Sequence, residues 1–342
     1  MSDGQVHVVF GAGQVGRALC ARLSEIGREV RSVSRQRPVG LADGVDWRAA
    51  DASDPQAAIR ATEGAAAIYQ CLNAPYTKWP ALFPPMQHGV LGAAEHHGAL
   101  LVSLENVYGY GPTGGTPMTE DHPLAATTVK GRTRAEMSRE LLSAAEAGRA
   151  RIAIGRASDF FGAGATESTL GERVFGNAVT GKRADFLGNP DLPHTYSYVP
   201  DIAAGLATLG TDDRAIGEVW HLPGPETATT REVLALVAAD VGHPVPIRTV
   251  PKPLVRALGL ISPMMRGLAE MAYEFEEPFI LDTSKYEGTF GAARTPLPAA
   301  ITATVAWYRD RAGRSSESQA PTGGVATDRP PAGPATGLDR GD

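Results

Sequence analysis

Short apolar runs alternate with segments of helical periodicity along the first half of the chain. Residues 5–10 (QVHVVF) and 29–34 (EVRSVS) are apolar runs of strand length, and residues 14–26 between them repeat apolar side chains at helical spacing. Further strands are predicted at 45–50, 66–72, 99–104 and 151–156, and further helices at about 86–97 and 131–147. This alternation predicts right-handed crossovers and a parallel sheet covered by helices on both faces.

The second half of the chain has a weaker pattern and predicts a smaller lobe. Turns rich in Gly and Pro interrupt it at 162–165, 188–193 and 223–225. A helix near 201–209 and a strand at 217–222 are expected between these turns. Thr229 and Glu232 have the spacing of a capping box before an apolar run, which predicts the start of another helix. A last helix is predicted over about 297–311.

The predicted fold class is α/β, a Rossmann-type doubly wound parallel sheet with a smaller C-terminal α/β substrate lobe. We assign residues 1–158 to the dinucleotide-binding domain and 159–312 mainly to the substrate lobe, with 195–222 returning to the main sheet. From Gly313 the chain is rich in Gly, Pro, Ser, Thr and Ala. Because this composition buries too little apolar surface to order a chain, 313–342 is predicted to be a disordered tail.

Charge and composition narrow the class of ligand to small molecules. The net charge of −6 argues against a general affinity for nucleic acid or an anionic membrane. The N-terminal segment lacks the pattern of a signal peptide, and no apolar run is long enough to span a bilayer, so a soluble cytoplasmic protein is expected. Cys20 and Cys71 lie in apolar runs, which predicts buried thiols, and no metal site is expected.

A glycine-rich turn follows the first predicted strand. Gly11, Gly13 and Gly16 form the pattern G-x-G-x-x-G where the strand ends and the helix begins. The first glycine permits a tight turn, the second lets a pyrophosphate approach the backbone, and the third allows close packing of helix and strand. The helix start favours an anion, so this turn, with Gln14 and Val15, is the predicted phosphate site of a dinucleotide.

The end of the second strand predicts which dinucleotide binds. NAD-specific loops usually place Asp or Glu there. This chain has Ser34, Arg35, Gln36 and Arg37 instead, and guanidinium groups suit a 2′-phosphate. NADP is therefore favoured over NAD. In the alternative interpretation, Arg35 and Arg37 are exposed loop charges without a ligand.

These motifs resemble the extended short-chain dehydrogenase/reductase superfamily of the NAD-dependent epimerase/dehydratase type, over about residues 5–311. The similar segments are GAGQVG (11–16), AADASD (49–54), YQCLNAP (69–75), VSLENVYGYGP (102–112), GRASDFFGAG (155–164) and TYSYVPDIAAGL (195–206). The resemblance implies that the cofactor also contacts Asp51, Ala52, Leu72, Asn73 and Ser103. It further implies a substrate pocket near Phe160, His194, Tyr196 and Tyr198, and a homodimer formed partly by the helix at 131–147.

The resemblance fails at the catalytic motif of the superfamily. Its members begin the helix after the fifth strand with Tyr-x-x-x-Lys, and KGRTRAE (130–136) places Lys130 and Arg134 at those positions. Arg134 would hold cofactor oxygens, while Lys130, Tyr108 or Tyr110 would take the acid/base role. A cation in the first turn of a helix also suggests a nearby anion. The alternative is a basic helix face exposed to solvent.

Three functions remain open at this stage. The favoured one is an NADP-dependent oxidoreductase that acts on a small organic metabolite with a rebuilt acid/base site. The second is an epimerase, isomerase or dehydratase that uses bound NAD(P) without net redox, with His194, Tyr196 and Tyr198 as candidate acid/base groups. The third is a non-catalytic NADP-binding module that regulates a partner. The sequence does not identify the substrate.

Overall fold

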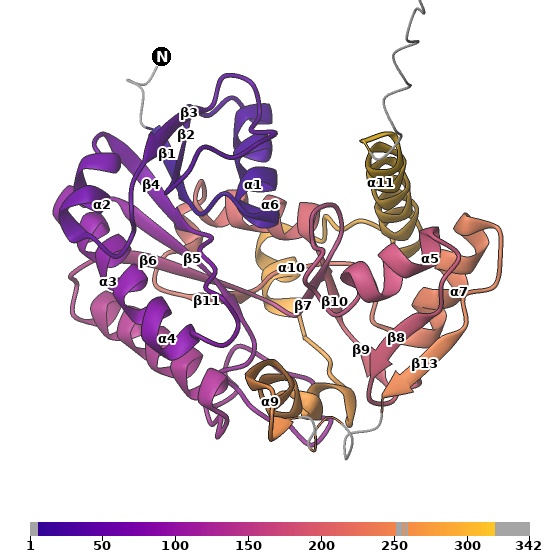
Figure 1. The fold of residues 1–342 in the computed structure, drawn as a ribbon. Helices are drawn as coiled ribbons and strands as arrows, with labels where there is room; N and C mark the ends of the chain where they lie inside the picture. Colours follow the sequence, from indigo (N-terminus) through magenta and orange to yellow (C-terminus); the bar gives the residue numbers. More distant parts are fainter. Residues whose placement is uncertain (1–5, 251–254, 256, 258, 319–342) are drawn as a thin grey trace, which may run out of the picture.

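A parallel sheet of seven strands occupies the left half of the molecule in Figure 1. The computed structural model describes residues 6–250, 255, 257 and 259–318. The strands lie in the order β11-β6-β5-β4-β1-β2-β3, and every neighbouring pair is parallel. They are β1 (Val6–Phe10), β2 (Val30–Ser34), β3 (Asp46–Ala49), β4 (Ala65–Gln70), β5 (Leu100–Asn106), β6 (Arg151–Ala157) and β11 (Val219–His221). The predicted doubly wound Rossmann-type fold is confirmed.

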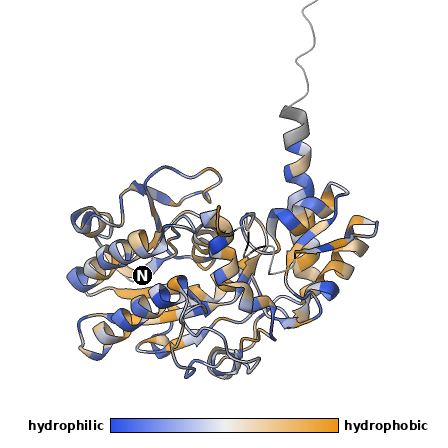
Figure 2. Ribbon diagram, turned by 60° about the horizontal axis from the view of Figure 1, so that its bottom comes forward, coloured by the Kyte–Doolittle hydropathy of each residue, from blue (hydrophilic) through white to orange (hydrophobic). Residues whose placement is uncertain are grey.

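Helices cover both faces of this sheet. On one face lie α1 (Gln14–Glu25) and α6 (Val199–Leu209); on the other lie α2 (Pro55–Ala61), α3 (Trp79–His97) and α4 (Val129–Glu146). Val9 of β1 packs into the first core and Val8 into the second, because side chains alternate across a strand. Figure 2 shows the strands as hydrophobic between helices that carry hydrophilic outer stripes. Burial on both faces explains the unbroken apolar runs of the sequence.

The smaller lobe lies on the right of Figure 1. It comprises the π-helical turn η1 (Gly171–Gly176), α5 (Asn177–Val179), the parallel strands β8 (Ala184–Leu187) and β13 (Ile247–Val250), α7 (Thr230–Val241) and α11 (Leu297–Ser318). Its core stacks Phe161 on Phe175 and Phe175 on Tyr308. The predicted capping box is present at the start of α7, where Thr229 and Glu232 bond reciprocally. Among the described residues, no helix has the length and apolar character needed to cross a bilayer.

Short elements join the two parts. The chain crosses between them through β7 (Asp159–Phe161), β9 (Pro193–His194), β10 (Tyr196–Tyr198) and β12 (Ala228–Thr229). The segment between β13 and α11 holds α9 (Pro263–Glu270), η3 (Ala272–Phe275) and α10 (Ser284–Phe290). Figure 1 shows α9 at the bottom, between the main sheet and the smaller lobe. A hydrogen bond and an ion pair join it to the first turn of α4.

Two helix boundaries differ from the prediction. Helix α3 begins at Trp79 rather than near 86, and it contains Pro84 and Pro85, residues that usually interrupt a helix. Helix α11 continues to Ser318, beyond the predicted end at 311 and into the segment predicted to be disordered. Extending a formed helix by a turn costs little compared with nucleating one, so weak composition does not end it. The rest of the predicted tail, 319–342, lies outside the described residues.

Candidate active site

The strand order reverses between β1 and β4, and the glycine turn lies at this point. Gly11 has φ +96°, and a Cβ atom there would lie 2.3 Å from the carbonyl oxygen of Cys71, just after β4. A Cβ atom on Gly16 would lie 1.8 Å from the carbonyl oxygen of Gly11. No atom lies within 4 Å of a Cβ built on Gly13. The first and third glycines are therefore required by packing, whereas the second borders open space.

The start of α1 is suited to an anion. Gly13 is the N-cap and provides no capping side chain, and Gln14 and Val15 form the first turn. Their N–H groups precede the first intrahelical bond, which runs from Arg17 to Gly13. The open space at Gly13 and an uncapped helix start together fit a pyrophosphate.

The loop after β2 contains a fixed hydroxyl and two arginines without close partners. Ser34 donates to the carbonyl oxygen of Gln36 (2.7 Å) and accepts from the Trp47 indole (3.0 Å). Arg35 and Arg37 are exposed, and among the described residues neither forms a hydrogen bond or ion pair. Hydrogen bonds from Ser53 lower the pKa of the exposed Asp51 carboxyl, and Arg35 adds to this effect. This loop retains the charges needed for a 2′-phosphate.

The other predicted cofactor residues differ in accessibility. Ala52 is buried under α3, where a Cβ on Gly89 would meet its carbonyl oxygen at 2.0 Å. Leu72 is partly buried and Asn73 is exposed after β4. Ser103 is fully buried, and its hydroxyl accepts from the Gln70 side chain at 3.3 Å. Its burial in this network speaks against direct contact between Ser103 and a cofactor.

Lys130 and Arg134 are buried, so the hypothesis of a solvent-exposed basic face is wrong. Only 5% of Lys130 and 6% of Arg134 is exposed. Glu270 of α9 supplies the anion that the first turn of α4 requires: its carboxylate accepts from the Lys130 backbone N–H (2.8 Å) and from Nζ (3.1 Å). The Lys130 ammonium also lies 4.2 Å from the centre of the Tyr76 ring.

Arg134 points to a different environment. Its guanidinium donates to the carbonyl oxygen of Leu104 in β5 (3.2 Å) and lies over the Phe83 ring. Its Nε is buried without a hydrogen-bond partner. The group bonded to the Lys130 ammonium is the Glu270 carboxylate, although Arg134 lies one helical turn away. Arg134 instead anchors α4 to the end of β5.

The two tyrosines predicted as acids have different surroundings. Tyr108 is partly buried and its ring stacks on Trp79, with 5.8 Å between ring centres. Burial raises the pKa of its phenol well above the usual value, and the carboxyl groups of Glu274 and Asp159 add to the shift. Among the described residues, no lowering of this pKa by the Lys130 ammonium is found. A phenol in this environment stays protonated at neutral pH.

Tyr110 belongs to a buried network instead. Its hydroxyl lies 2.6 Å from Arg156 and 2.6 Å from Nε2 of His221. Arg156 has only donors, so Tyr110 accepts from it and donates to His221, whose Nδ1–H donates to the carbonyl oxygen of Asp282. Burial lowers the pKa of His221 to about 3, which is consistent with this neutral tautomer. With both roles of its hydroxyl in use, Tyr110 is not available as the predicted acid.

Near Tyr108 lies a group of polar side chains that we did not predict. Tyr76 follows β4, Asp159 follows β6, and Tyr273 and Glu274 belong to η3. Glu274 and Asp159 both raise the pKa values of the Tyr76, Tyr108 and Tyr273 phenols, although burial is the largest cause in each. Tyr76 and Asp159 each follow a strand, and that position was the available sequence signal. Nothing local distinguishes Glu274 from the acidic residues around it.

The predicted substrate residues are divided between this group and the core. His194 lies 3.2 Å from Asp159 through Nε2, with its ring between Tyr196 and Phe275. Tyr196 is buried, and its hydroxyl bonds to Thr230 (2.8 Å). Tyr198 packs on Phe161, and the partly buried Phe160 packs on the main core. The geometry brings His194 to the acidic group and favours packing roles for the two tyrosines.

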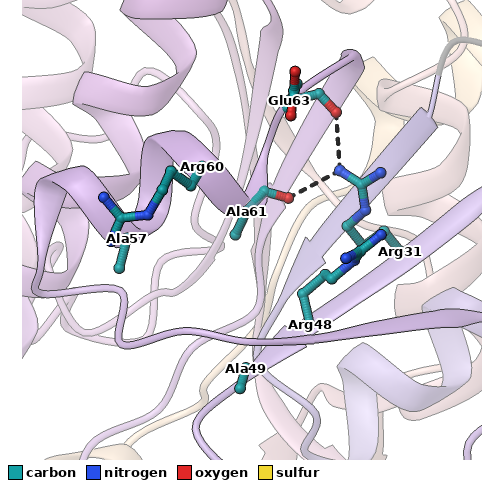
Figure 3. Close-up of a pocket in the computed structure, with 7 residues that line it drawn as sticks. All are labelled: Arg31, Arg48, Ala49, Ala57, Arg60, Ala61 and Glu63. Atoms are coloured by element: carbon teal, nitrogen blue, oxygen red, sulfur yellow. Dashed lines mark hydrogen bonds between the residues drawn. The ribbon is translucent and has the colours of Figure 1, made fainter.

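A recess elsewhere on the surface is not part of this site (Figure 3). It is lined by Arg31, Arg48, Ala49, Ala57, Arg60, Ala61 and Glu63. Arg31 donates to the carbonyl oxygens of Ala61 (3.0 Å) and Glu63 (2.9 Å). Arg31, Ala61 and Glu63 lie toward the amino ends of β2 and β4, away from the glycine turn at the carboxyl end of β1.

Comparisons with known proteins identify the family and agree with the Rossmann-type fold. The sequence model of the NAD dependent epimerase/dehydratase family matches residues 7–222. No curated protein matches the chain in sequence. An epimerase from Methanothermobacter thermautotrophicus superposes with a TM-score of 0.77 at 16% identity, covering 92% of this chain and 95% of that one.

Two further solved structures are similar in fold. The dTDP-glucose 4,6-dehydratase of Bacillus anthracis str. Ames, in complex with NAD, gives a TM-score of 0.75 at 15% identity and covers 90% of this chain and 97% of its own. The UDP-glucuronic acid 4-epimerase of Bacillus cereus, in complex with NAD, gives 0.74 at 15% identity, with 90% and 99% covered. Likeness at these identities establishes the fold of both parts of the molecule.

Proposed function

Since this chain belongs to the NAD dependent epimerase/dehydratase family, we propose that it is an NADP-dependent oxidoreductase with a rebuilt acid/base site. The observation that carries the proposal is the open space at Gly13, next to the uncapped start of α1 and at the reversal of strand order. NADP rather than NAD is proposed from Arg35 and Arg37, although the similar dehydratase and epimerase structures hold NAD.

The residues divide the work as follows. The turn from Gly11 to Gly16 holds the pyrophosphate, and Arg35 pairs with the 2′-phosphate. Lys130 and Arg134 take the two places of the Tyr-x-x-x-Lys motif in α4. The Lys130 ammonium pairs with Glu270, and the Arg134 guanidinium donates to the Leu104 carbonyl. The bound nicotinamide supplies or accepts a hydride.

Tyr108 supplies the proton in this proposal. When a carbonyl carbon receives the hydride, its oxygen takes the proton of the Tyr108 phenol and the product is an alcohol. The raised pKa of Tyr108 keeps the phenol protonated before the reaction, as a donor must be. Oxidation of an alcohol is the same step in reverse.

A second candidate is an epimerase or dehydratase that returns the hydride to its substrate within one cycle. The observation that favours it is the 3.2 Å distance between Oδ2 of the partly buried Asp159 and Nε2 of the buried His194, close to the three phenols. Such a pair offers an additional acid/base couple, which an epimerase or dehydratase needs and a simple reductase does not. This alternative consumes no NADPH.

Label transfer tests the proposal. The purified protein is incubated with NADPH that carries tritium at either face of the nicotinamide 4-position, together with a small-molecule extract of its host. Tritium in a metabolite is expected for wild type, and Tyr108→Phe should slow the transfer. Tyr308→Phe is the matched control, because it removes a buried hydroxyl without a partner in the smaller lobe.

The outcomes separate the candidates. Binding of NADPH with no movement of label contradicts the oxidoreductase. It leaves the internal-redox enzyme or a non-catalytic NADP-binding module. Exchange of solvent hydrogen into a metabolite then identifies the enzyme, since a binding module would catalyse none.

A further inference from the structure

Glu274 is a buried carboxyl group without a partner. The residue is 2% exposed, and its Oε1 atom is buried with no hydrogen bond. Among the described residues, no hydrogen bond or ion pair involves either oxygen of this carboxyl. Because an uncompensated buried carboxylate is very unfavourable, this environment favours the neutral form of the carboxyl. Burial raises its pKa well above the usual value, Asp159 adds to the shift, and Lys130 opposes it.

The groups around Glu274 belong to several elements. Its charged and titratable neighbours are Tyr76 after β4, Tyr108 after β5, Lys130 in α4, Asp159 in β7 and Tyr273 in η3. The Tyr273 hydroxyl is also buried without a partner. Two unsatisfied polar atoms on adjacent residues, close to the proposed proton donor, mark a place where a ligand would complete the hydrogen bonding.

The nearby Asp159 differs from Glu274 in this respect. Its Oδ2 lies 3.2 Å from Nε2 of His194 and 3.4 Å from the Thr169 hydroxyl. Two carboxyl groups in one site with unlike surroundings take unlike protonation states and roles. Asp159 accepts a hydrogen bond from Thr169, whereas Oε1 of Glu274 has no partner among the described residues.

Two of the described cations near this site are paired with carboxylates: Lys130 with Glu270 and Arg156 with Glu105. Arg134 donates to the Leu104 carbonyl and has a buried Nε atom without a partner. The groups that shift the pKa values of Glu274 and its neighbouring phenols are mainly carboxyls and phenols. These described surroundings suit a ligand group that accepts a hydrogen bond but carries no negative charge.

We infer that Glu274 is a protonated carboxylic acid that donates a hydrogen bond to an uncharged oxygen of the substrate and so selects substrates that are neutral at the reacting end. The part of this inference that concerns the substrate rests on the proposed function. The part that concerns the protonation state of Glu274 does not. Tyr108 remains the group that transfers the proton. Glu274 determines which oxygen-bearing group is accepted beside it.

The protonation state is tested without any substrate. Protein labelled with ¹³C at glutamate side-chain carboxyls is compared with the labelled Glu274→Gln variant by infrared difference spectroscopy at neutral pH. The band that disappears should be the carbonyl stretch of a neutral carboxylic acid. Loss of carboxylate bands alone would overturn the inference, whether or not hydride transfer is ever observed.

The substrate class is tested with a matched pair of probes. Benzyl alcohol and benzoate have similar shapes and differ in charge, and their affinity for the NADPH-saturated protein is measured by saturation-transfer NMR. Benzyl alcohol should bind at least about tenfold more tightly than benzoate. Equal or tighter binding of benzoate, or no binding of either probe, would overturn the assignment of substrate class.

Two variants separate hydrogen bonding from shape. Glu274→Gln keeps a donor at the same place and should preserve the affinity for benzyl alcohol. Glu274→Leu removes the donor and should reduce that affinity about tenfold or more. If both variants weakened it equally while thermal unfolding remained that of wild type, Glu274 would not be the donor.

Discussion

Two buried polar clusters in this protein differ in how completely their hydrogen-bonding groups are satisfied. In the first, Arg156 donates hydrogen bonds from Nε to Glu105 (3.1 Å), from Nη1 to Tyr110 (2.6 Å) and from Nη2 to Ser138 (2.6 Å). One oxygen of Glu105 lacks a hydrogen bond, but the carboxylate is compensated by Arg156. The cluster links β5, β6 and α4 into one unit.

The second cluster gathers phenols and carboxyls around Glu274 from the loops after β4 and β5, from β7 and from η3. The Glu274 carboxyl has no partner among the described residues, and the Tyr273 hydroxyl is buried without one. An unsatisfied buried group costs stability unless a ligand completes its hydrogen bonding. We therefore expect the Arg156 cluster to stabilise the fold, and we propose a ligand only for the Glu274 cluster.

The largest expected effect follows from breaking the satisfied cluster. Arg156→Met removes the cation and leaves Glu105 charged and buried, so the free energy of unfolding should fall by about 3–5 kcal/mol. Urea denaturation measures the change. Arg248→Met is the control, since Arg248 pairs with Asp185 at the surface and should cost at most about 1 kcal/mol. A small effect at Arg156 would remove the basis for calling its cluster structural.

The unsatisfied cluster should respond in the opposite direction. The folded-state pKa of Glu274 is raised. Its contribution to stability is therefore fully present below the unfolded-state pKa, about 4.3, and is lost as the pH rises through the folded-state pKa. Glu274→Gln removes this loss, so the variant should match wild type at low pH and exceed it as pH rises. The difference should grow by about 1.4 kcal/mol per pH unit within that window.

Thermal or urea unfolding of both proteins at several pH values checks this prediction. Stability curves that remain parallel from acid to alkaline pH would show that the folded protein does not hold the Glu274 proton. The variant should meanwhile lose no secondary structure, because it replaces a neutral acid by an amide of similar size.

The glycine turn also contains one residue required by packing and one available to a ligand. A Cβ atom on Gly16 would lie 1.8 Å from a backbone oxygen, whereas a Cβ atom on Gly13 would have no neighbour within 4 Å. Gly13→Ala should therefore leave unfolding unchanged and lower NADPH affinity about tenfold to a hundredfold, or about 1.4–2.8 kcal/mol, as measured by calorimetry. Gly92→Ala is the control, because a Cβ atom on this α3 residue also meets open space. Unchanged affinity of the Gly13 variant would place the cofactor elsewhere.

This contrast also separates what the sequence predicts from what it does not. The turn at Gly11, Gly13 and Gly16 is encoded within one short stretch, so its geometry follows from local rules. The burial of Lys130 depends on Glu270, which is 140 positions away, and no local pattern links the two. The sheet was predictable because its strands are buried on both faces and follow the alternation of the chain.

The acid/base group was predicted only in part, for a related reason. Tyr108 follows a predicted strand, but the surroundings that set its pKa come from η3 and β7. Tyr110 has the same local context as Tyr108, yet tertiary contacts with Arg156 and His221 commit its hydroxyl to the structure. Residue type and spacing therefore gave candidates for the acid/base group. What separates these candidates is whether each hydroxyl already has hydrogen-bond partners in the folded protein.

The smallest effect is expected at β2, where an arginine near each end repeats the comparison at the surface. Arg31 donates to the carbonyl oxygens of Ala61 and Glu63 (Figure 3). It also donates to Asp46, whereas Arg35 has no such partner among the described residues. Arg35→Ala should weaken NADPH binding about tenfold, or about 1.4 kcal/mol, and leave NADH binding unchanged. Arg31→Ala should instead lower the unfolding temperature and leave the NADPH:NADH preference intact. Equal affinity of wild type for the two cofactors, with no effect of Arg35→Ala, would assign the site to NAD, because a 2′-phosphate bound by this loop must lose affinity with that guanidinium.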